Sequence, residues 1–311
     1  MRSVREREVA AALLLDSLLG ELPEPLHPTV WMGRAISACA REASETKKLG
    51  VLYIKGAFLA LTLPALAYIM VQRLLGLAPG RSRCVLEAAL ISTTLAMRGL
   101  GEAAGTVERE LRAGDLERAR AGAAAMVGRD TADLPASEVA RAAVESVAEN
   151  TSDGVLAPML YGLLFGAPGA LAYRAVNTLD SMVGYRAYPY AEFGWASARL
   201  DDIANLAPAR ITALIVATVS GRPFHTLMSA WRYGSLTQSP NAGRVEAAFA
   251  GALGTRLGGP NSYGGVIREG PILGNGRPPG PEEIWHSVRL MRRCCALFVV
   301  AALLAERIRR G

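Results

Sequence analysis

Long apolar runs alternate along the chain with short polar blocks, and the longest of these runs predicts a helix that crosses a membrane. The clearest run is VLYIKGAFLALTLPALAYIMV, residues 51–71. As a helix rising about 1.5 Å per residue it would extend for roughly 30 Å, which is enough to cross the hydrocarbon core of a bilayer. Lys55, near one end, can extend its ammonium group to the interface, and Pro64 marks a position where the helix can bend.

The N-terminal segment, residues 1–20, predicts a second membrane helix. Three arginines precede the apolar stretch VAAALLLDSLLG, as they would in a secretory signal peptide. Asp16 interrupts the stretch, however, and no small-residue cleavage pattern follows it. We therefore predict an uncleaved first membrane helix.

Other apolar segments are shorter or interrupted. Residues 84–97 contain Glu87 and form either a partner helix or part of a further span. Residues 155–176 contain breakers such as Pro158 and Gly166, which predicts a broken pair of half-helices or a tight helical hairpin. The segments ITALIVATVSG and CCALFVVAALLAE, in the second half of the chain, could each span if their flanks are included.

Two regions differ in composition from the apolar runs. Residues from about 98 to 150 alternate acidic and basic side chains with Ala and Leu at helical spacing, divided by Gly114 and Pro135. This pattern predicts two or three amphipathic helices outside the bilayer, the last of them opening at Ser137 and Glu138. Residues from about 254 to 281 are rich in Gly and Pro and predict a long irregular loop of the kind that lies over a site.

Together these elements predict an all-α, polytopic integral membrane protein with broken helices and extramembrane amphipathic helices, built as one membrane-embedded domain over residues 1–311. The composition agrees with this class, because 51% of the residues are apolar and only 20% are charged. A mean hydropathy of +0.22 is high for a soluble enzyme and low for a transporter made mostly of spanning helices. Substantial polar portions are therefore expected beside the spans.

Charge and cysteine content exclude several other classes. The net charge of +6 suits anionic lipid or anionic small molecules. An aromatic content of 6% and scattered arginines argue against a nucleic-acid surface. The four cysteines contain no CxxC pair, so structural zinc and a disulfide framework are not expected, and a reducing, cytoplasmic side is the default.

The first candidate for chemistry is the acidic block AVESVAENTSDG, which precedes an apolar run. Glu145, Glu149 and Asp153 are spaced four apart and would line one face of a helix that persists through the block. Like charges at this spacing repel, and no basic residue lies within the block. The arrangement favours a compensating cation, and hard oxygen ligands suit Mg²⁺ carried with a phosphate. The alternative interpretation is a solvated helical face.

Two further polar blocks also lie at the boundaries of apolar segments. YRAVNTLDSMVGYR contains Arg174, Asn177 and Asp180, and ARLDDIAN contains Asp201 and Asp202. Ionisable groups at membrane depth are costly and mark a site or pathway by default. We therefore predict that the three blocks converge on one charged pocket.

Known short motifs do not account for these blocks. No GxxxxGK[ST] sequence occurs, so a P-loop is absent. Membrane phosphoalcohol transferases continue their Asp-Gly with an Ala-Arg pair, whereas Asp153 and Gly154 are followed by VLAP. Membrane prenyl transferases use repeated aspartates, whereas NTLDSMVG has a single Asp.

Longer segments resemble one family along nearly the whole chain, from about Leu13 to the C-terminal helix. These segments, in chain order, are LLLDSLLGELPEPLHPTVWMGRAI, VGRDT, AAVESVAENTSDGVLAPMLYGLLFGAPGALAYRAVNTLDSMVGYR, FGWASARLDDIANLAPARITAL, SPNAGRVEAAFAGALGTRLGG and NSYGG. They resemble cobalamin biosynthesis proteins of the CbiB/CobD type, which are adenosylcobinamide-phosphate synthases. One departure is LLGELPEP, where the family reads Leu-Gly-Asp-Pro, and this puts the role of Glu21 in doubt.

The resemblance implies a multi-pass enzyme of the inner membrane with its active site on the cytoplasmic side. It implies an ATP-dependent amide ligation that joins a propionate carboxyl of adenosylcobyric acid to the amine of aminopropanol phosphate, or of aminopropanol. ATP would convert the poorly electrophilic carboxylate to an acyl phosphate, which the amine would then attack. Mg²⁺ accompanies ATP, and cations, amides and a base are needed around the phosphates and the ammonium group. A homo-oligomer and association with other cobalamin-assembly enzymes are left open.

Carried onto this chain, the resemblance gives roles to the polar blocks. The catalytic hypothesis rests on Glu145, Glu149, Asp153 and Asp180, and the last three of these are also the expected metal ligands. The residues expected to bind substrate are His27, Arg34, Asn150, Arg174, Asn177, Arg199, Asp201, Asp202, Ser239, Asn241, Asn261 and Tyr263. Asn150 and Asn177 would orient polar groups, and Arg199 would hold a phosphate or carboxylate.

Several of these assignments have an ordinary structural alternative. A single His before Pro, as at His27, is more often structural than catalytic, and Arg34 could equally anchor a helix end at the membrane interface. Ser239 to Gly243 offers a helix start whose amides suit phosphate, or an ordinary cap on RVEAAFAGALG. Asn261 and Tyr263, in the Gly-rich loop, are expected to reach a corrin amide.

Two other classes of protein remain as alternatives at this point. An ion-coupled membrane transporter also uses intramembrane acids and broken helices, but predicts acidic groups near the bilayer midplane. A noncatalytic membrane scaffold for other corrin enzymes would leave the acidic blocks free to vary in charge.

Overall fold

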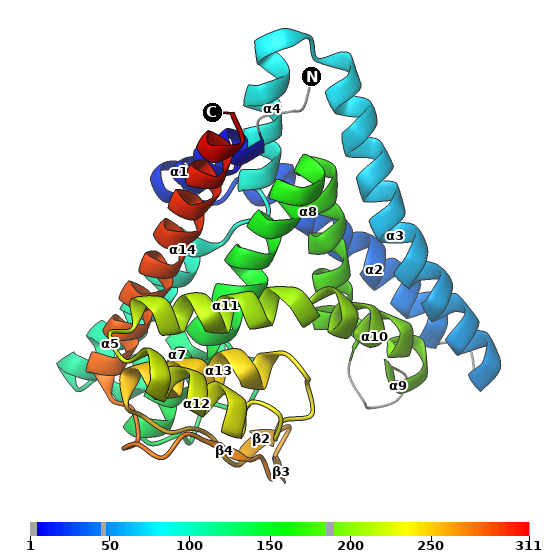
Figure 1. The fold of residues 1–311 in the computed structure, drawn as a ribbon. Helices are drawn as coiled ribbons and strands as arrows, with labels where there is room; N and C mark the ends of the chain where they lie inside the picture. The colour runs from blue at the N-terminus through cyan, green and yellow to red at the C-terminus, as the bar shows by residue number, and fades with distance from the viewer. Residues whose placement is uncertain (1–4, 45–47, 185–189, 311) are drawn as a thin grey trace. The chain divides into compact units, whose positions relative to one another are not determined.

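The computed structural model describes residues 5–44, 48–184 and 190–310, and these are almost entirely helical (Figure 1). The chain divides into two compact units. Unit 1 comprises Met1–Ala96, Ala157–Asn205 and Ala302–Gly311, and unit 2 comprises Met97–Leu156 and Leu206–Ala301. The single domain predicted for residues 1–311 stays a prediction, and the two units are described separately below.

The helices of unit 1 surround the long helix α8. They are α1 (Arg5–Leu19), a short 3₁₀ helix (Glu24–Leu26), α2 (Pro28–Ser44), α3 (Leu49–Leu77), α4 (Gly80–Ser92), α8 (Ala157–Val183), α9 (Tyr190–Phe193), α10 (Trp195–Ala204) and the last turns of α14 (Pro281–Arg310). Helices α1, α2, α3, α4 and α10 all pack against α8. One buried cluster joins Ile36, Leu52, Leu179 and Phe193, so apolar residues from four helices form this part of the core.

Helix α8 is broken, as the proline and glycine pattern of residues 155–176 predicts. Gly166 has a φ of +74°, outside the helical range, and the chain resumes a helix after it. The Glu87 side chain accepts a hydrogen bond from the Ala167 amide at 3.3 Å. A buried carboxylate thus binds the first free amide of the second half-helix, which satisfies a donor that the break exposes.

Three helical segments of the described residues are long and apolar enough to cross a membrane: Leu49–Leu77, Gly80–Ala113 and Ala136–Val183. A fourth candidate is α10 followed by α11 (Leu206–Val219), which are separated by a break at Asn205. The predicted span at residues 51–71 is confirmed as α3, with Pro64 inside it. The protein is therefore an all-α, polytopic membrane protein.

The expectation of a spanning helix at the N-terminus is wrong for the described residues. Helix α1 has 15 residues, or roughly 22 Å of helix, which is shorter than a hydrocarbon core of about 30 Å. Its buried side chains include Glu6, Glu8 and Asp16. Burial raises the pKa of Glu8 above its ordinary value. The apolar stretch in this segment packs on α4 and α8.

Unit 2 contains α5 (Met97–Ala113), α6 (Leu116–Ala124), α7 (Ala136–Asn150), a π-helical turn (Thr151–Leu156), α11, α12 (Pro223–Tyr233), α13 (Ala242–Leu253) and most of α14. The amphipathic region predicted at about 98–150 therefore forms three helices, divided at Gly114, where φ is +78°, and before Pro135. Its place outside the bilayer stays a prediction.

The Gly- and Pro-rich region 254–281 is more ordered than an irregular loop. Strand β1 (Leu257–Gly258) pairs antiparallel with β4 (Ile272–Leu273), and β2 (Asn261–Tyr263) pairs antiparallel with β3 (Val266–Arg268). Gly264 and Gly265 form the two-residue turn between β2 and β3, both with positive φ, as such hairpin turns require. The glycines thus encode tight turns, which composition alone did not distinguish from a loose loop.

Candidate functional site

Unit 2 contains a cavity of about 310 Å³ whose walls come from four parts of the unit. Helix α7, the segment after α6, helix α13 and the strand region all contribute. The polar residues that line it are Arg129, Glu145, Ser146, Glu149, Asn150, Thr237, Glu246, Asn261 and Tyr263. Five residues that the sequence predicts for the site meet here, namely Glu145, Glu149, Asn150, Asn261 and Tyr263. We call this the unit 2 cavity.

Glu145 is held by two arginines and one backbone amide. Its Oε1 accepts from Arg141 Nη1 at 2.9 Å and from the Gly258 amide at 2.6 Å, and its Oε2 accepts from Arg129 Nη1 at 2.7 Å. The expectation that no basic residue relieves the acidic block is therefore wrong, because Arg141 lies one helical turn before Glu145 and Arg129 reaches it from another segment. Both oxygens of the Glu145 carboxylate accept structural hydrogen bonds, which argues against a role as a free catalytic carboxylate.

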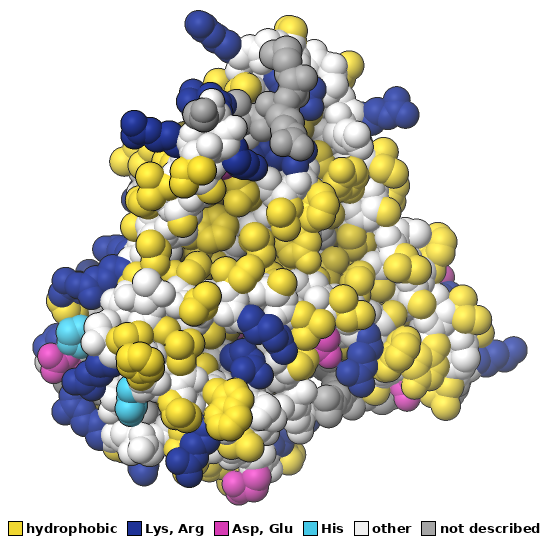
Figure 2. All heavy atoms as spheres, viewed as in Figure 1, with side chains coloured by type: hydrophobic (Ala, Val, Ile, Leu, Met, Phe, Trp, Pro, Cys, Tyr) yellow, Lys and Arg dark blue, Asp and Glu magenta, His cyan; other side chains and the backbone are white. Residues whose placement is uncertain are grey.

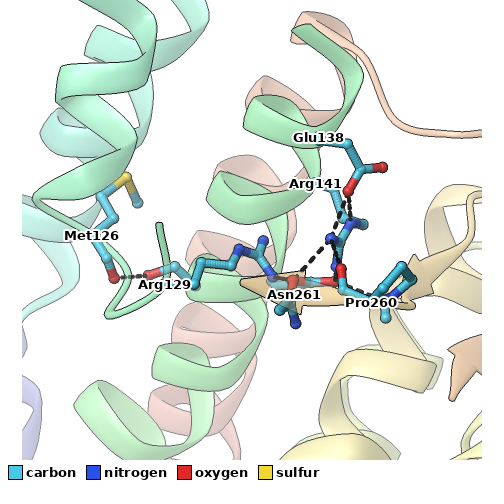
Figure 3. A network of polar contacts seen from close by, with 9 residues as sticks. Met126, Arg129, Glu138, Arg141, Pro260 and Asn261 are labelled. Atoms are coloured by element: carbon cyan, nitrogen blue, oxygen red, sulfur yellow. Dashed lines mark hydrogen bonds and ion pairs between the residues drawn. The ribbon is translucent and has the colours of Figure 1, made fainter. Parts of the chain in front are cut away.

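The same arginines fix the strand region to α7 (Figure 3). Asn261 Oδ1 accepts from Arg129 Nη1 at 2.5 Å and from Arg141 Nη2 at 2.9 Å. Arg141 Nη2 also donates to the Pro260 carbonyl at 3.1 Å, and Arg141 Nε donates to Glu138 at 2.7 Å. The Asn261 oxygen expected to reach a corrin amide is thus bound to two guanidinium groups.

Arg129 has two buried nitrogens that bind no atom in the described part of the chain. The residue is 8% exposed, and its Nε and Nη2 atoms lack hydrogen-bond partners among residues 5–44, 48–184 and 190–310. Leaving a buried donor unsatisfied costs about 1–3 kcal/mol. Because Arg129 lines the cavity, a bound anion is the partner that these donors fit best.

Two carboxylates line the cavity beside this guanidinium. Glu149 is exposed on α7 and Glu246 is partly buried on α13. Burial, followed by the nearby charges of Glu145 and Glu149, raises the pKa of Glu246 well above its ordinary value. The cavity thus combines donors suited to an anion with carboxylates suited to a cation or a proton.

A neighbouring aspartate closes the β2–β3 hairpin. The Asp130 carboxylate accepts from Ser262 Oγ at 2.6 Å, from the Gly264 amide at 3.0 Å and from the Gly265 amide at 2.8 Å. These three hydrogen bonds lower the pKa of Asp130, with the Ser262 hydroxyl contributing most. Arg129 and Asp130 are adjacent in the chain, so the segment that supplies the cavity guanidinium also holds the hairpin.

The second predicted acidic group lies in unit 1. Asp180 on α8 and the pair Asp201 and Asp202 on α10 are near enough for their carboxylates to interact electrostatically. Asp201 accepts from Asn205 Nδ2 at 3.0 Å and also from Asn177. We call these five residues the unit 1 acidic cluster. Of the three polar blocks predicted to converge on one pocket, the second and third meet here in unit 1, whereas Glu145 and Glu149 of the first block line the unit 2 cavity. The convergence of all three blocks stays a prediction.

Other predicted residues of unit 1 have structural contacts. His27 Nδ1 accepts from the Thr29 amide at 3.3 Å at the start of α2, as the structural alternative expects, and burial lowers the pKa of His27. Arg174 donates to Asn177 Oδ1 at 3.3 Å, and both His27 and Arg174 line a separate cavity of about 400 Å³ in unit 1. Arg34 is exposed on α2.

Arg199, which was predicted to bind an anionic group of the substrate, has an anionic partner within the protein. Arg199 Nη1 lies 3.4 Å from Asp202 Oδ2 on the same helix, α10. The guanidinium expected to hold a phosphate or carboxylate therefore pairs with the neighbouring acid.

Asp153 does not continue the face formed by Glu145 and Glu149. Residues Thr151–Leu156 form a π-helical turn, which has more residues per turn than an α-helix. The four-residue spacing that would align the three acids therefore ends at Asn150. Asp153 is absent from the lining of the unit 2 cavity.

At Ser239 to Gly243 the side chain of Ser239 caps the start of α13. Ser239 Oγ accepts from the amides of Asn241 and Ala242, both at 3.3 Å. Asn241 Oδ1 accepts from Arg210 Nη1 at 3.4 Å. The ordinary cap, and not an open phosphate site, is what the structure shows at these two amides.

Sequence reasoning missed Arg129, Arg141 and Glu246. Arg129 is part of the VGRDT segment, and its basic charge close to the acidic block in sequence was a usable signal. Arg141 precedes Glu145 by four residues, the spacing of a helical ion pair. Glu246 is the single acid within the apolar segment VEAAFAGAL, and an isolated buried acid is a signal in itself.

The donor chemistry of both acidic groups suits a hard cation, since each offers carboxylate oxygens with nearby amide groups. Among residues 5–44, 48–184 and 190–310, no three His, Cys, Asp or Glu side chains are arranged to hold a metal ion. Mg²⁺ is commonly bound by one or two carboxylates together with substrate phosphates. The residues therefore fit an ion that arrives with an anionic ligand better than a resident ion in a closed protein cage. The metal set predicted from the sequence, Glu149, Asp153 and Asp180, stays a prediction.

Comparison with known proteins defines the family. This polytopic all-α membrane protein matches the model of the CobD/Cbib protein family over residues 9–291. The chain belongs to this family.

Curated relatives match nearly the whole chain. "Cobalamin biosynthesis protein CobD" of Geobacter metallireducens is 43% identical over 306 residues, which are 95% of each chain. The protein of the same name from Klebsiella pneumoniae is 42% identical over 289 residues, covering 90% of this chain and 91% of the relative. That from Halalkalibacterium halodurans is 40% identical over 301 residues, covering 94% and 93%. No solved structure shows significant similarity to the chain.

Proposed function

We propose that the protein is an adenosylcobinamide-phosphate synthase of cobalamin biosynthesis in the inner membrane. It joins a propionate carboxyl of adenosylcobyric acid to the amine of aminopropanol phosphate, or of aminopropanol, at the expense of ATP. Family membership and the names of the relatives support a role in cobalamin biosynthesis. The observation that carries the finer assignment is the unit 2 cavity, in which unpaired Arg129 nitrogens lie among carboxylates. The transporter alternative is not favoured, because these relatives carry the name of a biosynthesis protein.

The cavity chemistry suits the amine substrate. An anion alone would be repelled by Glu149, and a cation alone would leave Arg129 unsatisfied. A small molecule that carries both an ammonium and a phosphate group meets both requirements. Arg129 Nε and Nη2 would bind the phosphate, and the carboxylates would accept hydrogen bonds from the ammonium.

The amine must lose a proton to become a nucleophile, and Glu246 is suited to accept it. In its ionised form a carboxylate with a raised pKa is a stronger base than an ordinary glutamate, and burial raises the pKa of Glu246. Glu149, exposed in the same cavity, is the second candidate base. Glu145 is excluded from this role by its two arginine partners.

The unit 1 acidic cluster is the proposed site for the nucleotide with its ion. Mg²⁺ supplies charge neutralisation at the nucleotide phosphates when it is bound. Asp180 and Asp202 would hold it, and the Asn177 and Asn205 amides, by binding Asp201, keep that carboxylate oriented. In the reaction a propionate oxygen attacks the γ-phosphorus of ATP and releases ADP. The amine then attacks the acyl phosphate carbon, the C–N bond forms and phosphate leaves.

The direct test incubates detergent-purified protein with adenosylcobyric acid, ATP, Mg²⁺ and each candidate amine. Mass spectrometry should detect a corrinoid heavier by the amine less water, together with one ADP per product. No mass-shifted corrinoid with any amine would overturn the proposal.

Matched variants test the assigned residues. Glu149→Gln, Asp180→Asn and Asp201→Asn should each lose activity by at least about tenfold while the protein stays monodisperse. Asp133→Asn and Glu42→Gln, exposed controls in unit 2 and unit 1, should keep wild-type activity. Full activity in both Asp180→Asn and Asp201→Asn would remove the unit 1 acidic cluster from the mechanism.

A further inference from the structure

In helix α12 of unit 2 the large apolar side chains point outward, and the small and polar side chains are buried. Its outward side chains include Phe224, which is 88% exposed, and Trp231, which is 73% exposed, with Met228 also exposed between them. Its buried face consists of small or polar residues, among them Thr226 and Ser229. A helix on a water-facing surface shows the opposite pattern.

The buried face is specific and closely packed against α13. Ser229 Oγ donates to the Ala247 carbonyl at 2.7 Å. A Cβ atom added at Gly251 would lie 2.7 Å from Ser229 Cβ and 3.1 Å from Thr226 Cα, so only glycine allows the approach. Small residues and side-chain hydrogen bonds are typical of helix contacts in membranes. The orientation of α12 is therefore fixed by its inner face, and the apolar face cannot turn inward.

The length and position of α12 favour a membrane surface over a span. Its 11 residues extend for roughly 16 Å, about half of the hydrocarbon thickness. It packs beside α11, which belongs to the fourth candidate span. Packed helices lie about 8–10 Å apart, so α12 stays close to a segment apolar enough for the bilayer.

The charges beside α12 complement anionic lipid. Arg222 immediately precedes the helix and Arg232 lies in its last turn, and both are exposed. The helix itself contains no acidic residue. Figure 2 shows hydrophobic side chains on the face where α12 lies, with Lys and Arg side chains beside them. An apolar face with Trp and Phe, bordered by arginine, is characteristic of helices that lie in the interfacial layer.

We propose that α12 lies in the interfacial layer of the bilayer, with Phe224, Met228 and Trp231 inserted among acyl chains and with Arg222 and Arg232 at the phosphates of anionic phospholipids. This proposal is independent of the proposed function. It places a surface-lying helix of unit 2 on the membrane in addition to the spanning segments.

Trp231 provides a direct measure of depth, because the chain has only four tryptophans. The triple variant Trp31→Phe, Trp195→Phe and Trp285→Phe retains Trp231 alone. It is reconstituted into vesicles of phosphatidylglycerol and phosphatidylcholine with bromines placed either near the headgroup or near the chain end. Quenching by the shallow bromines should be about twofold stronger than by the deep ones, since interfacial helices insert only about 5–10 Å.

The matched control retains Trp285 alone, with Trp31, Trp195 and Trp231 replaced by Phe. Arg289 covers the Trp285 ring at 4.4 Å from its centroid, and this protein should show much weaker quenching. Equal quenching in both proteins, or no quenching of Trp231, would overturn the proposal. Stronger quenching of Trp231 by deep than by shallow bromines would also overturn it.

Two additional measurements keep the test decisive if the triple variants do not fold. The single variant Trp231→Phe should remove most of the depth-dependent quenching of the whole protein. The double variant Arg222→Gln and Arg232→Gln, with all four tryptophans present, should lose the difference in total tryptophan quenching between anionic and neutral vesicles. Protection of Trp231 by a second copy of the chain, shown by quenching that appears only on dilution to monomer, would contradict a lipid contact.

Discussion

Arg129 places Nη1 2.7 Å from Glu145 Oε2, while its Nε and Nη2 atoms, on the same buried guanidinium, bind no atom of the residues that the structure describes. One side of the group is therefore structural and the other is available to a ligand. This division allows the two roles to be separated by substitution.

Arg129→Lys should weaken binding of the phosphorylated amine while the protein stays folded. Lysine retains the positive charge but loses the planar arrangement of donors that matches phosphate. We expect the KM for aminopropanol phosphate to rise about tenfold, equivalent to about 1.4 kcal/mol, with a smaller change in kcat. Steady-state kinetics with unphosphorylated aminopropanol is the control, and its KM should not change. Parallel increases for both amines would remove Arg129 from phosphate recognition.

Glu145→Gln should mainly lower the stability of the protein, whereas Glu149→Gln should mainly lower its activity. Glu145→Gln leaves two buried guanidinium groups without their shared carboxylate, and breaking such a buried arrangement costs about 3–5 kcal/mol. Glu149 is exposed in the cavity, so Glu149→Gln should unfold at nearly the wild-type temperature and lose activity. Thermal unfolding in detergent measures the stability of each variant, and the ligation assay measures its activity. Equal stability of the two variants would contradict the structural role of Glu145.

Asp130→Asn should loosen the β2–β3 hairpin and leave the helices unchanged. The substitution replaces an acceptor of three hydrogen bonds, including those from the Gly264 and Gly265 amides. Hydrogen exchange of residues 261–268 should accelerate in Asp130→Asn. In the wild type the same acceleration should appear as the pH falls through the lowered pKa of Asp130, because the contribution of a carboxylate with a lowered pKa is lost on protonation. Asp133→Asn, in the same connection, should exchange like the wild type.

Glu246→Gln should flatten the pH dependence of stability on its alkaline side. The folded protein holds the Glu246 proton more tightly than the unfolded chain, whose pKa is near the ordinary value of 4.5. The contribution of Glu246 to stability is therefore complete below that value and decreases as the pH rises toward the raised pKa. As the pH rises above 4.5 toward the raised pKa, the variant should lose less stability than the wild type. Glu269→Gln, an exposed control, should follow the wild-type curve, and coinciding curves for all three proteins would refute the prediction.

Gly166→Ala should destabilise the broken helix α8. Gly166 has a φ of +74°, and a Cβ atom there would lie 2.4 Å from Glu87 Oε1. The positive φ alone costs about 1–3 kcal/mol for a residue with a side chain. Gly76→Ala on α3 is the control, since its Cβ meets no atom within 4 Å and alanine favours a helix. Thermal unfolding should show a loss for Gly166→Ala and no loss for Gly76→Ala.

Much of the fold was predictable because local patterns determine it. The apolar run at residues 51–71 predicted the spanning helix α3, and the proline and glycine residues within 155–176 predicted the break in α8. These features depend on the composition of a single segment. The N-terminal prediction was wrong because an apolar stretch of that kind is also found in a helix that packs inside the protein, as α1 does on α4 and α8.

The candidate site was predictable in part, for a different reason. Helical spacing brought Glu145 and Glu149 together, and the unit 1 acidic cluster was expected from blocks at apolar boundaries. Arg129 and Glu246, however, reach the cavity from segments outside α7. The helical spacing within the acidic block does not include either residue, although Arg129 is close to that block in sequence. The π-helical turn at Thr151–Leu156 removes Asp153 from the helical face of Glu145 and Glu149. A prediction based on α-helical spacing does not include such a turn.

The order of segments in the two units limits how this protein can be divided. The chain passes from one unit to the other four times, after Ala96, Leu156, Asn205 and Ala301. No single cut therefore releases an intact unit, and each unit completes its core only with residues synthesised late in the chain. Truncations that extend into residues 97–301 from either end would damage both units at once, and a gene split within residues 97–301 would produce two fragments that must find each other before either unit is complete.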